Sequence, residues 1–206
     1  MAAPSSNPYV GPRSFRSGET LYGRERETED LLDRLISERV ILLYSPSGAG
    51  KSSLIRAALV ARLQEEGFHV LPIMRVNLEP DAALSRRMTY NRYLLSLLLS
   101  LEQTLPPEQQ KPIAELARLD LNTYLKQRPV EVMANASGGE VLIFDQFEEI
   151  LSVNPHDVEA KQVFFQQVAI ALRDKQRWGL FAVREDYVGP LEPYVQGIPT
   201  QLENEF

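Results

Sequence analysis

The stretch Ser45-Pro46-Ser47-Gly48-Ala49-Gly50-Lys51-Ser52 follows a continuous apolar run at 40–44 and precedes a segment of helical periodicity at 52–66. Its two glycines allow backbone N–H groups to turn inward around a phosphate chain, its lysine reaches the β and γ oxygens, and its last serine can ligate Mg²⁺. A strand, a loop and a helix in this order predict a P-loop, although Ser45 stands where the pattern has its first glycine. The alternative is a Gly/Ser turn with a solvated lysine. We assign these residues to a phosphate cradle: Ser47, Gly48, Ala49, Gly50, Lys51, Ser52 and Ser53.

A second motif, Val141-Leu142-Ile143-Phe144-Asp145-Gln146-Phe147-Glu148-Glu149, places carboxylates at the end of a buried strand. Ligands of open α/β sheets bind at the carboxyl ends of the strands, so the motif has the character of a Walker B element. Asp145 is expected to hold Mg²⁺ together with Ser52, and either Glu148 or Glu149 is expected to activate the attacking water. The alternative is an acidic turn that caps the following helix.

Arg184 follows the apolar run at 180–183 directly. Its guanidinium group is therefore expected at the same end of the sheet as Asp145, where it could sense a γ-phosphate. A surface arginine paired with Glu185 or Asp186 is the other interpretation.

The order of apolar and periodic segments predicts the fold class. Apolar runs at 40–44, 70–76, 141–144 and 180–183 alternate with helical periodicity at 25–37, 52–66, 90–127 and 157–174. Strands that are apolar throughout are usually covered on both faces. We therefore predict an α/β fold of three layers, with a mostly parallel sheet and helices on both faces.

Composition limits the cellular setting and the partners. The 206 residues carry a formal charge of −6 and contain no cysteine. The charge disfavours nucleic acid as a partner, and the absence of cysteine excludes disulfides and thiolate metal sites. The longest apolar stretch, Tyr93 to Leu101, is too short to cross a membrane and is expected to be a buried helix. With no apolar core in the first residues, a cytoplasmic location is expected.

Several motifs together resemble the STAND class of signalling NTPases, and in particular its "novel STAND" prokaryotic branch. They are the P-loop, Asn7-Pro8-Tyr9, Leu21-Tyr22-Gly23-Arg24-Glu25, Asp145-Gln146-Phe147-Glu148-Glu149 and Arg184-Glu185-Asp186-Tyr187. The resemblance covers essentially the whole chain. It implies an AAA-like core of the additional-strand, catalytic-glutamate type, in which the Arg184 strand lies between the Lys51 and Asp145 strands.

The resemblance also implies a division of the chain. Residues 1–24 are expected to form an adenine-side segment, with Tyr9, Tyr22, Gly23 and Arg24 near the base, and residues 25–206 the nucleotide-binding domain. For the two tyrosines plain core packing is an equal alternative, and for Arg24 a surface ion pair.

Members of this class are switches that hold ADP in a closed form and exchange it for ATP, so the resemblance implies an ATP/ADP-binding switch domain with Mg²⁺ and weak ATPase activity. Protein partners are expected but not identified by the sequence. Two alternatives remain: an AAA-type ATPase acting on DNA, and a scaffold that is stabilised by nucleotide without hydrolysing it.

The last residues carry a further expectation. The segment 197–199 leads into 201–206 with no strand or helix apparent in the sequence. In the family that the motifs resemble, a final sheet strand and a helical lid over the nucleotide follow this point, so the resemblance implies that the outer edge of the strand at 40–44 is unpaired and open to self-association. A helical lid over the nucleotide is also expected to be missing.

Overall fold

The computed structural model describes residues 23–78, 89–128 and 138–206. Its sheet has the order β1-β4-β3-β2, and each neighbouring pair is parallel. The Arg184 strand thus lies between the strands that precede the P-loop and Asp145, as expected. The four strands are β1 (Val40–Ser45), β2 (His69–Val70), β3 (Glu140–Phe144) and β4 (Arg177–Arg184).

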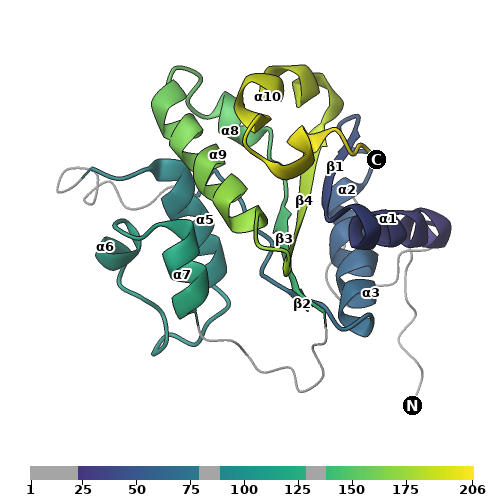
Figure 1. The fold of residues 1–206 in the computed structure, drawn as a ribbon, viewed down its shortest axis with the longest axis horizontal. Coiled ribbons are helices and arrows are strands. Elements are labelled where there is room, and N and C mark those ends of the chain that lie inside the picture. Colours follow the sequence, from purple (N-terminus) through teal and green to yellow (C-terminus); the bar gives the residue numbers. More distant parts are fainter. Residues whose placement is uncertain (1–22, 79–88, 129–137) are drawn as a thin grey trace, which may run out of the picture.

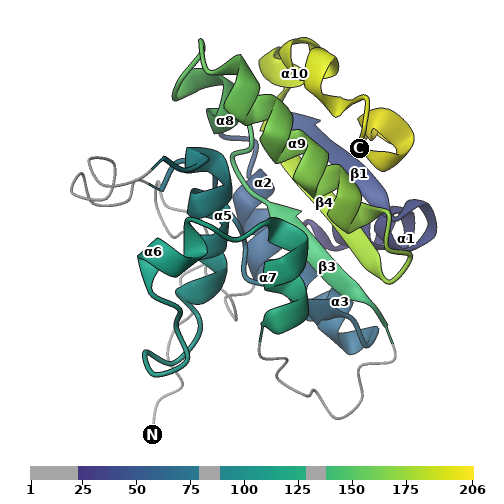
Figure 2. The same ribbon diagram turned by 60° about the vertical axis from the view of Figure 1, so that its left-hand side comes forward.

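Helices cover both faces of this sheet (Figure 1, Figure 2). One face carries α1 (Glu25–Glu38) and the helix after the P-loop, which consists of α2 (Lys51–Leu54), a π-helical segment η1 (Ile55–Leu59) and α3 (Val60–Glu65). The other face carries α5 (Arg92–Glu102), α7 (Leu121–Gln127), α9 (Val158–Leu172) and α10 (Val188–Val195). Short elements connect them: α6 (Ile113–Leu116), α8 (Glu149–Ser152), η2 (Glu185–Tyr187) and η3 (Pro199–Leu202).

Alternation of side chains along the strands produces two cores. In β1, Val40 and Leu42 belong to the core that α9 and α10 help to form, whereas Ile41 and Leu43 belong to the core formed with α1 and α3. All four are nearly fully buried. Both faces are therefore apolar, which confirms the predicted three-layer α/β fold and explains why the strands read as continuous apolar runs.

The apolar run at 70–76 forms a shorter strand than its composition indicates. Regular pairing ends at Val70, and Met74 forms an isolated bridge with Phe144. Pro72 has no N–H to donate to β3. The Leu71 N–H donates to Val141, but the next bond to β3 comes from Met74 to Ile143, so the chain accommodates one extra residue, as in a bulge.

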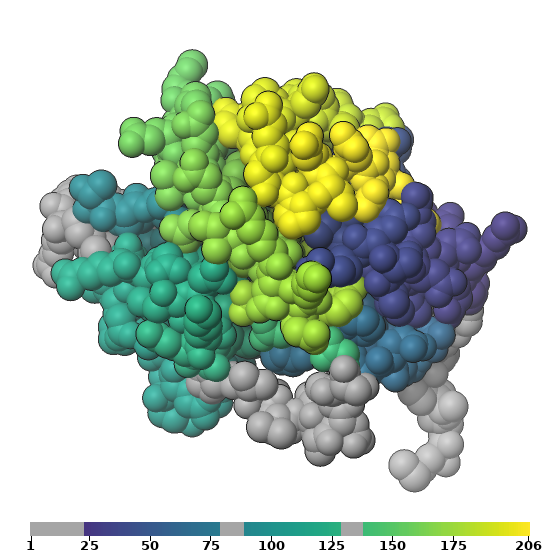
Figure 3. Space-filling view, in the orientation of Figure 1, coloured from purple at the N-terminus to yellow at the C-terminus, as the bar shows by residue number. Residues whose placement is uncertain are grey.

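The outer edge of β1 is paired, which contradicts the expectation of a free edge. The N–H of Leu42 donates to the carbonyl of Asn204 at 2.9 Å, and that of Phe206 donates back to Leu42 at 2.9 Å. Leu42 and Glu205 form a parallel bridge, and η3 precedes it. Neither element shows apolar periodicity in the sequence. In Figure 3 the yellow C-terminal region lies directly against the dark blue surface, the colour range that includes β1.

The expected buried helix at 93–101 is present as α5, whose apolar side chains are covered almost completely. Within the described ranges, we find no helix with the length and apolar character that crossing a membrane requires.

Candidate functional site

Strand register brings the predicted site residues to one end of the sheet. Ser45, the last residue of β1, pairs with Arg184, the last residue of β4. Phe144 at the end of β3 pairs with Phe181, and Asp145 follows it. The P-loop, Asp145 and Arg184 therefore begin at the carboxyl ends of three adjacent strands, where ligands of α/β sheets bind.

The P-loop has the backbone conformation that its glycines predict. Gly48 and Gly50 have φ angles of +79° and +91°, which favour glycine over residues with a Cβ. Gly50 is the residue before α2. The first N–H groups of a helix have no acceptor within the helix, so they point toward the space in front of the loop.

Lys51 is folded onto its own loop. Its ammonium group donates to the Ser45 carbonyl at 2.8 Å, to the Ser45 hydroxyl at 3.0 Å and to the Pro46 carbonyl at 3.2 Å. Burial lowers the pKa of Lys51, while Glu148 acts in the opposite direction. Among the described residues no carboxylate forms an ion pair with Lys51, and a partly desolvated cation of this kind is well suited to receive phosphate.

Asp145 is the centre of a charged cluster and is 2% exposed. Its Oδ1 accepts a 2.7 Å hydrogen bond from the Ser52 hydroxyl. Its Oδ2 lies 3.1 Å from Nη2 of Arg56 and 3.7 Å from Nη2 of Arg75. The structure thus brings the two predicted metal ligands, Ser52 and Asp145, into contact.

Arg56 and Arg75 belong to the charged cluster but were not predicted from the sequence motifs. Arg56 had a signal, because it lies four residues after Ser52 and so shares its face of the helix. Arg75 had a weaker one, as a charge near the end of the apolar run at 70–76. Only the tertiary structure shows that both side chains reach Asp145.

The two glutamates after Asp145 have different environments. Glu148 Oε2 accepts the backbone N–H of Arg184 at 3.3 Å. Glu149 Oε2 is buried, and it has no hydrogen-bond partner among the described residues. Gln146, which directly follows Asp145, has φ +54°, an uncommon value for a residue with a side chain. Such backbone conformations often occur at functional sites.

Burial raises the pKa of Glu149. Arg75 lowers it, and the neighbouring charges of Glu148 and Asp145 raise it further. A carboxylate with a raised pKa and an unpartnered oxygen is suited to accept a proton from water. Of the two candidates for the base, the geometry therefore favours Glu149.

Arg184 lies at the predicted end of the sheet, but its side chain has an internal partner. Nε and Nη2 form two hydrogen bonds to the Asp186 carboxylate, at 3.1 and 2.7 Å. Its guanidinium carbon also lies 5.4 Å from the centre of the Tyr187 ring. This is the ion pair that the sequence analysis left open. A role toward a γ-phosphate would require Arg184 to leave Asp186.

Arg24 contacts the P-loop itself. Its Nη2 donates to the carbonyl of Ala49 at 2.6 Å, and Nη1 pairs with Glu27. Gly23 precedes it with φ +77°. Tyr9 and Tyr22, the other residues assigned to the adenine side, lie outside the described residues, and so does most of the segment 1–24.

The donor set fits Mg²⁺ held jointly by protein and nucleotide. The described ranges contain no group of three or more histidine or acidic side chains that could hold a metal ion. Mg²⁺ usually takes one or two protein ligands plus phosphate oxygens and water. One hydroxyl and one carboxylate, as in Ser52 and Asp145, match that requirement.

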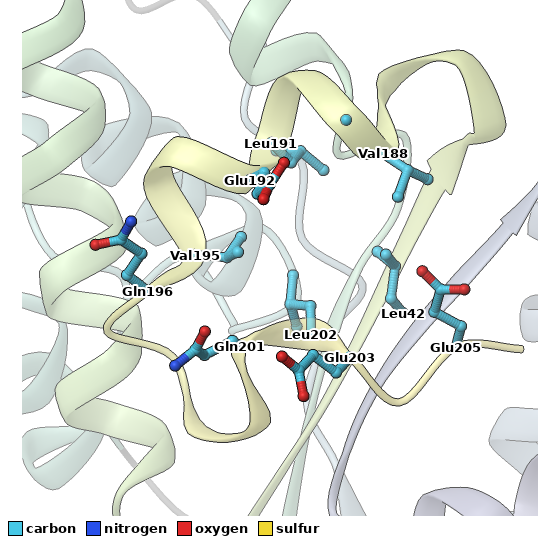
Figure 4. A pocket seen from close by; sticks show the side chains of 11 residues that line it. Leu42, Val188, Leu191, Glu192, Val195, Gln196, Gln201, Leu202, Glu203 and Glu205 are labelled. Atoms are coloured by element: carbon cyan, nitrogen blue, oxygen red, sulfur yellow. The ribbon is translucent and has the colours of Figure 1, made fainter.

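A separate cavity of about 350 Å³ lies between α10 and the C-terminal segment (Figure 4). Its lining includes Leu42, Leu191 and Leu202 together with Glu192 and Glu203. None of the residues lining it belongs to the P-loop or the Asp145 cluster. We therefore do not assign the phosphate-binding chemistry to this cavity.

Comparisons with known proteins agree with the fold and the motifs. Among solved structures, a Walker-type ATPase of Pyrococcus abyssi is similar, with a TM-score of 0.56 and 20% sequence identity. The match covers 90% of this chain and 51% of the other, so this chain spans about half the length of that ATPase. At this identity the likeness shows the fold alone. No curated protein sequence matches the chain.

The family comparison covers nearly the whole chain. Residues 8–204 match the family described as Novel STAND NTPase 1, and the match includes the P-loop, Asp145 and Arg184. This confirms the resemblance that the motifs indicated. The chain belongs to the Novel STAND NTPase 1 family.

Proposed function

We propose that the chain is an ATP- and ADP-binding switch domain that requires Mg²⁺ and hydrolyses ATP slowly. The observation that carries this proposal is the 2.7 Å hydrogen bond between Ser52 and Asp145 beside the ammonium group of Lys51. In a Mg²⁺-nucleotide site the protein typically contributes a hydroxyl and a carboxylate that lie in contact, next to a lysine that binds phosphate.

Each chemical role falls to a residue of this chain. Backbone N–H groups of the P-loop and Lys51 would bind the phosphate oxygens, and Ser52 and Asp145 would hold Mg²⁺. Bound Mg²⁺ neutralises charge that develops on the phosphate oxygens. Glu149 orients the attacking water and accepts its proton, and Arg184 contacts the γ-phosphate after leaving Asp186.

Two contacts support slow turnover. Lys51 is bonded to Ser45 and Arg184 to Asp186, so two cations of the site must exchange their partners before they reach phosphate. Hydrolysis that depends on such rearrangement is gated by conformation rather than by chemistry. The unpartnered Glu149 oxygen favours a hydrolysing domain over a scaffold that only binds nucleotide.

Calorimetry with ATP and ADP, each with Mg²⁺ and with EDTA, tests the proposal. We expect both nucleotides to bind and Mg²⁺ to strengthen the binding of each. Mass spectrometry of nucleotide released from the denatured purified protein identifies the natural ligand. Steady-state phosphate release then distinguishes a slow ATPase from a scaffold. Failure of either nucleotide to bind would contradict the proposal.

A further inference from the structure

Two arginine side chains lie beside the Asp145 carboxylate, and together they carry the same charge as a divalent cation. Two guanidinium groups, from Arg56 and Arg75, lie on the same carboxylate oxygen, and the Ser52 hydroxyl occupies the other. A carboxylate that is 2% exposed would be costly to bury without such partners. Both oxygens of Asp145 therefore have partners within the chain.

Arg56 is placed by the helix that follows the P-loop. It lies in the π-helical segment η1, four residues after Ser52, so the two side chains reach opposite oxygens of Asp145 from one helix face. The side chain of Arg56 is 32% exposed. It is therefore close to solvent and has room to move away from the carboxylate.

Arg75 comes from a different element, the segment after β2, and its backbone is held by α5. Its N–H donates to the Ser100 hydroxyl at 3.2 Å, and its carbonyl accepts a 2.8 Å hydrogen bond from Ser96. Both serines are buried. The backbone of Arg75 is thus fixed, while its side chain is 37% exposed.

We propose that Arg56 and Arg75 are a counter-cation pair that takes the place of Mg²⁺ at Asp145 in the nucleotide-free domain. Binding of Mg²⁺ with nucleotide then displaces the two guanidinium groups from the carboxylate. This inference rests on the proposed function, because it concerns the same metal site.

The physical reason is competition for one anion. Mg²⁺ held near Asp145 while both arginines remained would bring positive charges close to one another at a partly desolvated site. The arginines therefore stabilise the metal-free domain and weaken its apparent affinity for Mg²⁺. The same pair sets the Mg²⁺ concentration at which the nucleotide-bound state forms.

The test uses Arg56→Gln, Arg75→Gln and the double variant, none of which removes a proposed metal ligand. Mg²⁺ is titrated at fixed ADP, with binding followed by calorimetry, and thermal unfolding is measured in EDTA without nucleotide. We expect each glutamine variant to lower the half-saturating Mg²⁺ concentration by about three- to tenfold. We also expect each to melt at a lower temperature than the wild type in EDTA.

Three further variants complete the design. Arg26→Gln removes an arginine whose side chain is 94% exposed and lies near Asp30 rather than Asp145. It should therefore leave both measurements unchanged. Arg56→Lys and Arg75→Lys keep the positive charge but form a weaker contact with the carboxylate, so they should give intermediate shifts. The lysine variants also replace the glutamine variants if those fail to fold.

The outcomes separate the inference from the proposed function. One outcome is that nucleotide binding by the wild type depends on Mg²⁺ but the variants require as much Mg²⁺ as the wild type, or more. The proposed replacement of the arginines by Mg²⁺ is then wrong, and the proposed function stands. If ADP binding by the wild type does not depend on Mg²⁺, the proposed function is wrong, and so is the proposed replacement of the arginines by Mg²⁺. The proposed replacement is supported if the variants have both a lower half-saturating Mg²⁺ concentration and a lower melting temperature in EDTA than the wild type.

Discussion

The ammonium group of Lys51 lies 2.8 Å from the carbonyl oxygen of Ser45, the residue that stands where the P-loop pattern has its first glycine. The Ser45 hydroxyl is a second acceptor at 3.0 Å. The departure from the pattern therefore provides the lysine with an extra partner. On the proposed function, phosphate would have to replace both contacts.

Lys51→Ala is expected to weaken ATP and ADP binding by roughly 2–4 kcal/mol, because it removes a P-loop cation and leaves phosphate charge uncompensated. Calorimetry with both nucleotides measures the loss. Lys175→Ala, at an exposed position on the turn before β4, is the matched control and should bind as the wild type does. Unchanged affinity in Lys51→Ala would refute the P-loop assignment.

Asp145→Asn is expected to abolish most of the Mg²⁺-dependent part of nucleotide binding and to spare binding in EDTA. The substitution withdraws a carboxylate from the metal shell but leaves the backbone donors of the P-loop in place. Affinity measured with and without Mg²⁺ gives the two parts. An equal loss under both conditions would argue against a metal role for Asp145.

Arg184→Ala is expected to lower ATP affinity more than ADP affinity, because a group that reaches the γ-phosphate contributes binding that ADP cannot use. Asp186→Asn is the companion variant. It weakens the two hydrogen bonds that hold Arg184 and should raise ATP affinity relative to ADP. If Arg184→Ala weakens both nucleotides equally, Arg184 does not sense the γ-phosphate.

Glu149→Gln is expected to stop ATP turnover while leaving nucleotide binding intact, since it removes the base and spares the cradle. Single-turnover phosphate release measures the effect, and Glu148→Gln serves as the comparison. Glu148 receives the Arg184 N–H, so its replacement should reduce turnover less. The reverse order would assign the base to Glu148.

The raised pKa of Glu149 has consequences for pH. Turnover should fall as pH drops through that pKa, at a higher pH than for an ordinary carboxyl group. Because the folded state favours the protonated form, ionisation at neutral pH costs stability. Glu149→Gln should therefore raise the melting temperature at pH 7. The gain should vanish once the pH falls below the pKa of an unfolded glutamate.

Much of the architecture follows from local sequence. The P-loop needs only the order of glycines, lysine and serine between a strand and a helix, and the structure has Gly48 and Gly50 in the expected left-handed conformation. Strands β1, β3 and β4 read as apolar runs because both of their faces are buried. Their boundaries agree with the prediction to within a few residues.

Where the sequence failed, a backbone or long-range effect decided the outcome. Pro72 interrupts pairing inside an apolar run, so β2 ends early. The residues 204–206 pair with β1 although they carry no apolar periodicity, because their backbone groups bond to a strand more than 160 residues away. Pairing of this kind depends on the partner strand and leaves little trace in the segment itself.

The sequence by itself determined the family, through the P-loop and the acidic strand end, and it predicts that Lys51, Ser52 and Asp145 carry the phosphate and metal chemistry. Only the tertiary structure decided how these charges are balanced. Arg56 and Arg75 reach Asp145 from two different elements, and Glu149 rather than Glu148 has a buried oxygen that bonds to none of the described residues. The physical reason is that motif chemistry follows from spacing along the chain, whereas the neutralisation of a buried charge depends on side chains that folding brings together.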